Sequence, residues 1–200
     1  MAGEIDMLIL QAVPRNVKYS KVQRFYQDEV IFITGATGFL GKALLEKLLR
    51  SCPGIERIYL LIRPKRDFSP TRRLELLLRS ACFERLRQEC PSSLNKLVVV
   101  DGDIREEKLG LKSGDYERLA SDVSMVFHTA ADVRFNQSLR NAVKINMEGT
   151  KHVLDLCHHI KKMKAVVHVS TAFAHSDLDA LEERVYPSTV KPDDIISLTK

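Results

Sequence analysis

The chain has 200 residues, 44% of them hydrophobic, which is enough to bury one sizeable core, so we expect one main domain. The formal net charge is +5, and no basic stripe interleaved with aromatic residues is present, which argues against nucleic-acid binding. No apolar stretch approaches the ~18 residues of a membrane-spanning helix, and the start of the chain lacks the features of a signal peptide, so we expect no membrane segment in this chain.

The cysteines and histidines show no metal-binding pattern. The four cysteines form no Cys-x-x-Cys pair, and the six histidines are spread without ligand spacing. We therefore expect free thiols, as in a reducing compartment, and no metal site. The cysteines are Cys52, Cys82, Cys90 and Cys157.

Residues 1–28 are expected to form a lead-in segment, with a short helix near Val22 and Phe25. The domain, residues 29–200, then opens with an apolar run that enters a turn containing three glycines. Leucines at four-residue intervals follow, which predicts a helix with one apolar face. Strand, glycine turn and helix in this order are typical of the phosphate-binding corner of a dinucleotide fold, because the glycines let the backbone approach a pyrophosphate and the helix start offers free N–H groups. An ordinary strand-turn-helix without a ligand is the alternative. The glycines are Gly35, Gly38 and Gly41, and the leucines are Leu40, Leu44 and Leu48.

Apolar runs continue to alternate with amphipathic segments along the rest of the chain. Ser69 and Pro70 are suited to the N-cap and first position of the second of these helices. Nearly all-apolar strands separated by helices indicate an α/β fold with a doubly wound parallel sheet, the Rossmann NAD(P)-binding fold, truncated after about its fifth strand. The expected strands are 30–33, 57–62, 97–100, 125–128 and 165–169, and the helices after the glycine corner are 70–78, 113–119 and 139–160.

Ligands of such sheets bind at the carboxyl ends of the strands, so the residues after each strand are the candidates for a site. After the second strand, Arg63 stands where an NAD site would place an acid, and the nearest acid in the sequence, Asp67, comes four residues later. The cationic run 63–66 suits the 2′-phosphate of NADP, while a solvated basic turn is the alternative. The sequence therefore favours NADP.

The third and fourth strands supply weaker candidates. Asp103 is placed to accept a hydrogen bond from an adenine amino group, with Ile104 packing on the ring, although Asp is also a common turn residue. Ala130 and Ala131 are small residues past which the backbone of a cofactor could run closely.

After the fifth strand, Ser170 and Thr171 present two hydroxyls where a substrate carbonyl would lie, with backbone capping as the alternative. His128 and His168, each near the end of a strand, are interpreted as core or edge histidines. Asn146 lies inside the last expected helix, where Asn costs stability, so we expect a water-held bend or a close approach to a neighbouring strand there.

Together, six motifs resemble the extended short-chain dehydrogenase/reductase superfamily and, within it, the alcohol-forming fatty acyl-CoA reductases of animals. The resemblance covers the chain from about residue 22 to its last residue. The motifs are Thr-Gly-Ala-Thr-Gly-Phe-Leu-Gly at 34–41, Tyr-Leu-Leu-Ile-Arg-Pro-Lys at 59–65, Gly-Asp-Ile at 102–104, Val-Phe-His-Thr-Ala-Ala at 126–131, Asn-x-x-Gly-Thr at 146–150 and Val-His-Val-Ser-Thr-Ala-Phe at 167–173.

This resemblance implies binding of NADPH and reduction of a long-chain fatty acyl-CoA to a fatty alcohol. It also implies a place on the cytoplasmic face of peroxisomal or endoplasmic-reticulum membranes, with attachment through a C-terminal part that these residues do not include. Its implied site residues are Gly35, Thr37, Gly38, Phe39, Leu40 and Gly41 at the pyrophosphate, Arg63 at the 2′-phosphate, Asp103 and Ile104 at the adenine, Ala130 and Ala131 at the nicotinamide half, and Thr171, or less favourably Ser170, at the substrate carbonyl.

One departure from the superfamily pattern concerns its proton donor, the Tyr of a Tyr-x-x-x-Lys pair. Tyr186 comes nearest to that pattern here, but Val190 holds the lysine position and Lys191 comes one residue late. We therefore expect the N-terminal part of a reductase. A naturally short, non-catalytic nucleotide-binding protein is the alternative, and a sugar-nucleotide epimerase or dehydratase is a weaker one.

Overall fold

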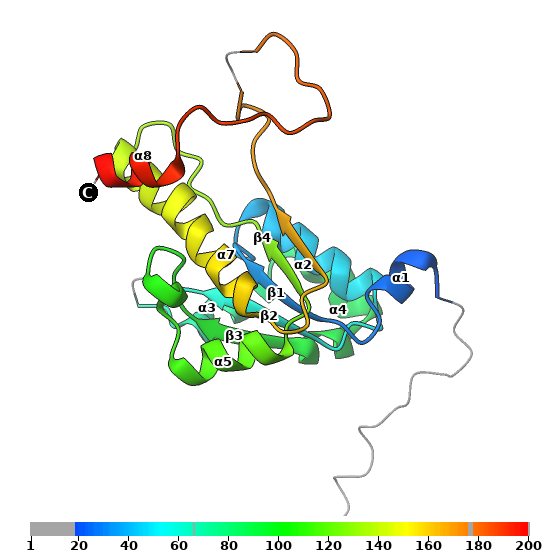
Figure 1. Cartoon of the computed structure of the whole chain (residues 1–200). Coiled ribbons are helices and arrows are strands. Elements are labelled where there is room, and N and C mark those ends of the chain that lie inside the picture. The colour runs from blue at the N-terminus through cyan, green and yellow to red at the C-terminus, as the bar shows by residue number, and fades with distance from the viewer. Residues whose placement is uncertain (1–18, 66, 176–177, 200) are drawn as a thin grey trace, which may run out of the picture.

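The computed structural model describes residues 19–65, 67–175 and 178–199, so most of the expected lead-in segment and Lys200 lie outside the described residues. Its centre is a five-stranded, all-parallel sheet in the order β3-β2-β1-β4-β5 (Figure 1). This confirms the doubly wound sheet expected from the sequence. The strands are β1 (Val30–Thr34), β2 (Arg57–Ile62), β3 (Leu97–Asp101), β4 (Met125–His128) and β5 (Ala165–His168).

Helices cover both faces of the sheet (Figure 1). Alternate residues of β1 point to opposite faces, so Ile31 packs on the side of α2, α3 and α4, while Phe32 packs on the side of α5 and α7. Every residue of β1 is buried, which is why its first four residues are apolar, and the last residue, Thr34, is a buried polar one. The helices are α1 (Lys21–Phe25), α2 (Phe39–Ser51), α3 (Pro70–Leu78), α4 (Glu84–Glu89), α5 (Ser113–Asp122), α6 (Leu139–Val143), α7 (Gly149–His159) and α8 (Pro192–Leu198).

The expected helix starts are confirmed where capping residues mark them. Ser69 caps α3 by accepting a hydrogen bond from the Arg72 N–H at 3.2 Å, and Pro70 is the first residue of the helix. The expected lead-in helix is α1, which begins with a capping box between Ser20 and Gln23.

The long helix expected over 139–160 is wrong in one respect, because a π turn at Lys144–Glu148 divides it into α6 and α7. Within this turn, the Asn146 amide bonds directly to the backbone of Asp132, accepting from its N–H at 2.8 Å and donating to its C=O at 2.9 Å. Gly149 follows, and a Cβ there would lie 3.0 Å from Cδ1 of Ile104. The bend is thus fixed by a loop after a strand, and no water is needed to explain it.

Two further observations concern side chains away from the strand ends. The four cysteines are free thiols, and burial raises the pKa of Cys157 to about 11. In the described part of the chain, no group of three or more His, Cys, Asp or Glu side chains is arranged to hold a metal ion, and no helix is long and apolar enough to cross a membrane.

Candidate functional site

A cleft of about 570 Å³ opens at the carboxyl ends of β1, β2, β3 and β4, where the strand order reverses beside β1. Ligands of doubly wound sheets bind at this position. Most of the predicted cofactor residues, which come from four separate stretches of the sequence, line this one cleft. They are Gly35, Thr37, Gly38, Arg63, Asp103, Ile104, Ala130 and Ala131.

The glycine corner leaves no room for side chains. Gly35 has a φ of +76°, and a Cβ on it would lie 2.6 Å from the backbone N of Ala130. A Cβ on Gly41 would lie 2.2 Å from the C=O oxygen of Gly35, so Gly41 lets α2 pack on the turn and does not line the cleft. The Gly38 N–H donates to the Gly35 C=O at 2.9 Å, and Gly38 caps α2 without a side chain. The start of α2 therefore reaches the cleft as bare backbone, a suitable place for an anion.

Phe39 and Leu40 are in the first turn of α2, and their side chains do not line the cleft. Phe39 is 87% exposed and Leu40 is 48% exposed. Any contact of these two residues with a ligand in the cleft would therefore come from their backbone N–H groups at the helix start.

Arg73 of α3 is a site residue that the sequence reasoning missed. Its guanidinium donates to the Arg63 C=O at 2.5 Å and to the Thr37 hydroxyl at 3.2 Å, and it lines the cleft. Burial and the nearby charge of Arg63 lower the pKa of Arg73. A signal was available in the sequence: Arg72 and Arg73 occupy the first turn of a helix, where the helix dipole disfavours cations.

Asp103, which the sequence suggested as an acceptor for an adenine amino group, already has two arginine partners in the structure. It is within 3.6 Å of the Arg63 guanidinium, and it accepts bonds from the Arg105 side chain at 2.6 and 3.0 Å. Burial on its own would raise the pKa of Asp103, but the hydrogen bonds from Arg105 and the charges of both arginines outweigh burial and lower it. The fold therefore brings to Arg63 an acid that is distant from it in sequence.

Another wall of the cleft is the segment after β4. The Thr129 hydroxyl donates to the Thr34 C=O at 2.7 Å, and the Ala130 N–H donates to the Thr34 hydroxyl at 3.4 Å. Further along, Asp132 pairs with Arg134, whose hydrogen bonds lower the pKa of Asp132 to about 2. The wall is thus tied to the end of β1 through Thr129 and Ala130.

Ser170 and Thr171 follow β5, and neither lines the cleft. Both residues are exposed, and the Thr171 hydroxyl accepts a hydrogen bond from the Phe173 N–H at 3.2 Å. This is the capping geometry that was the alternative for this pair. The strand end itself is tied to β4, because the Val169 N–H donates to the His128 C=O at 3.0 Å.

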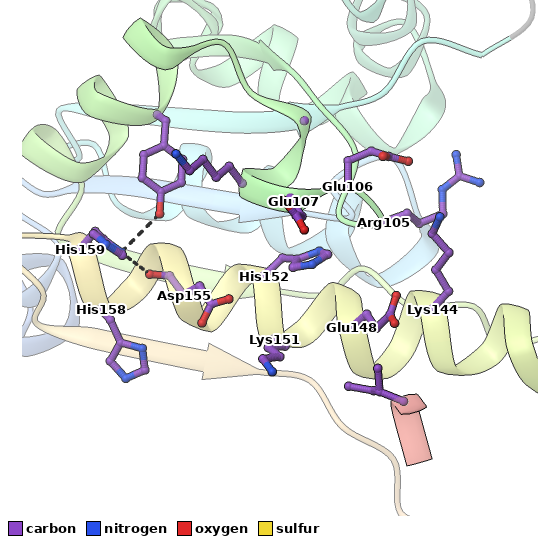
Figure 2. Close-up of a pocket in the computed structure, with 14 residues that line it drawn as sticks. Arg105, Glu106, Glu107, Lys144, Glu148, Lys151, His152, Asp155, His158 and His159 are labelled. Carbon is purple, nitrogen blue, oxygen red and sulfur yellow. Dashed lines mark hydrogen bonds between the residues drawn. The ribbon is translucent and has the colours of Figure 1, made fainter. Parts of the chain in front are cut away.

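A second and larger cleft, of about 1150 Å³, runs along α7 between α5, α8 and the loop after β3 (Figure 2). Lys144, Lys151, Glu148 and Asp155 bring both signs of charge to it in equal number. The glycine corner after β1 and the segment after β4 do not line it. We therefore place the functional site in the smaller cleft.

Comparison with known proteins assigns the chain. The NAD-binding family model described as "Male sterility protein" matches residues 33–199. Fatty acyl-CoA reductase 1 of Mus musculus is 41% identical over 175 residues, which are 88% of this chain and 34% of the relative. The putative fatty acyl-CoA reductase CG8306 of Drosophila melanogaster is 41% identical over 182 residues, 90% of this chain and 35% of that protein. The chain thus spans about a third of the length of these relatives.

Solved structures give the same fold. The reductase domain of a nonribosomal peptide synthetase from Mycobacterium tuberculosis matches with a TM-score of 0.62 and 30% identity, over 76% of this chain and 35% of that one. A UDP-glucuronic acid 4-epimerase from Bacillus cereus, in complex with NAD, matches with a TM-score of 0.52 at 22% identity, over 85% of this chain and 49% of that one, which supports the fold alone. Because the family model covers most of the residues and the relatives are similar over nearly the whole chain, this chain belongs to the male sterility protein family, whose members include fatty acyl-CoA reductases.

Proposed function

We propose that this chain is the cofactor-binding part of an NADPH-dependent fatty acyl-CoA reductase that converts long-chain acyl-CoA to fatty alcohol. The observation that carries the proposal is the cleft, which places two arginines beside a glycine turn at the ends of the strands. The chain that forms this cleft is 41% identical to a fatty acyl-CoA reductase. Because the chain resembles this family, we also propose that the protein is located at the cytoplasmic face of peroxisomal or endoplasmic-reticulum membranes.

The residues of the cleft fit a dinucleotide phosphate. A Cβ at Gly35 would clash with the backbone of Ala130, so the close approach of this segment to the turn depends on its being glycine. The start of α2, which no side chain caps, would take the pyrophosphate on its N–H groups. Arg63 and Arg73 would hold the 2′-phosphate, since both line the cleft and a guanidinium can donate two hydrogen bonds to one phosphate.

Asp103 has a different role in this proposal from the one that the sequence suggested. Its carboxylate already accepts bonds from Arg105 and lies beside Arg63. It would therefore hold the Arg63 side chain at the cleft, and Ile104, which is buried, would remain to pack against the adenine.

The bound nicotinamide would supply a hydride to the acyl carbonyl. Ala130 and Ala131 would give the flat wall along which that half of the cofactor lies. Thr171, or less favourably Ser170, would donate a hydrogen bond to the carbonyl oxygen as charge develops on it. For this, the Thr171 hydroxyl would keep its bond from the Phe173 N–H and direct its own proton to the substrate.

The test is a comparison of NADPH and NADH binding by titration calorimetry. We expect NADPH to bind at least about tenfold more tightly, a difference of about 1.4 kcal/mol, because only NADPH carries the phosphate that the arginines would hold. Arg63→Ala and Arg73→Ala should each remove most of that difference and leave the affinity for NADH nearly unchanged.

Arg72→Ala is the matched control, since Arg72 is in the same helix turn as Arg73 and pairs instead with Glu75. It should leave the preference for NADPH intact. Equal affinities for the two cofactors in the unmutated protein would contradict the proposed cofactor.

A further inference from the structure

His128, at the end of β4, was interpreted from the sequence as a core or edge histidine, and its surroundings are more specific than that. The side chain is 2% exposed and hydrogen-bonded through both ring nitrogens. Nδ1 lies 2.6 Å from the Thr34 hydroxyl at the end of β1, and Nε2 lies 3.1 Å from the Thr150 hydroxyl in α7. The ring also stacks on His168 of β5, with centroids 5.0 Å apart. One side chain thus joins three strands and a helix.

The direction of each hydrogen bond of His128 can be assigned because each threonine hydroxyl has only one proton to donate. The Thr150 hydroxyl donates its single proton to the Asn146 C=O at 2.8 Å, so it must accept from Nε2–H of His128. In the neutral ring Nδ1 is then the acceptor, and it takes the proton of the Thr34 hydroxyl. The Thr34 oxygen in turn accepts from the Ala130 N–H.

These bonds close into a circuit that begins and ends on the same wall of the cleft. From Ala130 it passes through Thr34, His128 and Thr150 to the Asn146 C=O. The Asn146 side chain then bonds both backbone groups of Asp132. The wall 130–132 is therefore held at both ends, and His128 is the link between the two halves of the circuit.

We propose that neutral His128 is a positioning residue that sets the distance between the wall 130–132 and the glycine turn, and thereby the seat of the nicotinamide half of the cofactor. The wall has little freedom to shift toward the turn, because the Ala130 backbone already packs on the α-carbon of Gly35. The identity of the ligand, a nicotinamide cofactor, rests on the proposed function, whereas the positioning of the wall by His128 does not.

The protonation state needed for the circuit is maintained by the surroundings of His128. Burial, and then the neighbouring His168, lower the pKa of His128 to about 4. At neutral pH the ring therefore carries one proton, and the hydrogen bond to Thr150 fixes that proton on Nε2.

The test removes one link while keeping its shape. Thr34→Val leaves a β-branched side chain of similar size but no hydroxyl, so the Ala130 N–H and His128 Nδ1 both lose their partner. We expect the Kd for NADPH to rise about tenfold. The Kd for 2′,5′-ADP, which contains only the adenine half and the 2′-phosphate, should stay within about twofold. Thr34→Ser, which restores the hydroxyl, should return NADPH binding to that of the unmutated protein.

If His128 had only a structural role, Thr34→Val would lower the free energy of unfolding but would change the Kd values for NADPH and 2′,5′-ADP by the same factor. Equal changes in the two Kd values would overturn the inference. Should Thr34→Val fail to fold, Thr150→Val breaks the other side of the circuit and should give the same separation. If the unmutated protein binds 2′,5′-ADP but not NADPH, the inference is overturned, because the positioned wall then does not seat the nicotinamide half.

A second measurement is independent of any nucleotide. In ¹⁵N NMR spectra of the unmutated protein at neutral pH, His128 should show a protonated Nε2 and a bare Nδ1 that accepts a hydrogen bond. The opposite tautomer, or a rapid mixture of both, would overturn the inference. Failure to bind either nucleotide, with the expected tautomer present, would contradict the proposed function and leave the positioning of the wall supported.

Discussion

At the scale of single residues, the cleft is defined by which charged groups meet in it. Arg63 lies 3.6 Å from Asp103, and Arg73 reaches the same strand end from α3. A partly exposed arginine loses side-chain freedom when it binds, so a neighbouring carboxylate that already restrains it reduces that cost. The acid beside Arg63 therefore lowers the entropic cost of ordering this arginine when a phosphate binds.

His128 gives a prediction for the dependence of stability on pH. The folded state takes up a proton on His128 only near pH 4, whereas the unfolded chain does so near 6.5. Between these values the unfolded state binds more protons, so the free energy of unfolding falls as pH falls through this window. From pH 7 to pH 5 this residue should account for a loss of about 2 kcal/mol.

The measurement is urea denaturation of the unmutated protein and of His128→Asn at both pH values. The variant is expected to be less stable at pH 7 but to lose about 2 kcal/mol less on acidification. Parallel losses in the two proteins would mean that His128 titrates alike in the folded and unfolded states.

On the proposed function, Thr171 gives a prediction for catalysis, to be measured in an extended form of this chain. Thr171→Val should lower kcat by ~10²-fold, the scale for loss of one hydrogen-bond donor to a developing oxyanion. NADPH affinity should stay nearly unchanged, since Thr171 does not line the cofactor cleft. A silent Thr171→Val together with a crippling Ser170→Ala would move this role to Ser170.

Much of the cleft could be predicted from the sequence, and the limits of that prediction have a physical reason. Parallel strands end at the same edge, so Arg63, Ile104 and Ala130 could be placed near one another once the strands were recognised. The first-turn position of Arg73 was an available signal, but its contacts in the cleft and the pairing of Asp103 with Arg63 could not be predicted, because both depend on how far a side chain reaches from a neighbouring element. Strand spacing alone does not determine that reach.

At the scale of elements, the sequence predicted every strand of the sheet but not the break between α6 and α7. The expected helix was drawn over a long amphipathic run, and an amphipathic run does not by itself show where an α turn gives way to a π turn. Asn146 and Gly149 did mark the place, since both are poor helix formers. The form of the break depends on the Asp132 backbone, which is not adjacent in sequence.

The packing of α2 on the glycine turn predicts that alanine substitutions at two glycines have opposite effects on stability. Gly41→Ala should lower the free energy of unfolding by about 2–3 kcal/mol, because the new methyl group would meet rigid backbone at the turn. Gly114→Ala in α5 is the matched control, since a Cβ there meets nothing within 4 Å, and it should raise stability by about 0.5–1 kcal/mol. Similar values for the two variants in urea denaturation would show that α2 can move away from the turn at little cost.

At the scale of the whole molecule, the sheet has an exposed side at β5. Val166 and Val167 are 40% and 44% exposed, although residues of β1 in the same sheet are fully buried. Exposed apolar strands at a sheet edge favour association. The segment after β5 runs away from the sheet before it returns to α8 beside α7 (Figure 1).

We expect these 200 residues, expressed by themselves, to bind NADPH but not to turn over acyl-CoA. An oxyanion formed at the carbonyl must be protonated, and a positioned acid typically supplies 10²–10⁴-fold in rate. The sequence contains no Tyr-x-x-x-Lys pair for this step. Absorbance at 340 nm with palmitoyl-CoA should stay constant for this chain and fall for a longer form that includes such a pair. Equal rates would show that the donor lies within these residues.

The hydrogen bond between Thr34 and His128 joins residues 94 positions apart in the sequence. A contact of this separation can form only after a long loop has closed, and proteins dominated by such contacts fold slowly. The glycine turn is local and can be made early, but the opposite wall reaches it only when β4 has paired with β1. During refolding, nucleotide binding should therefore recover after the helical circular-dichroism signal, and a shorter piece that stops before β4 would possess the turn without ever acquiring a cleft.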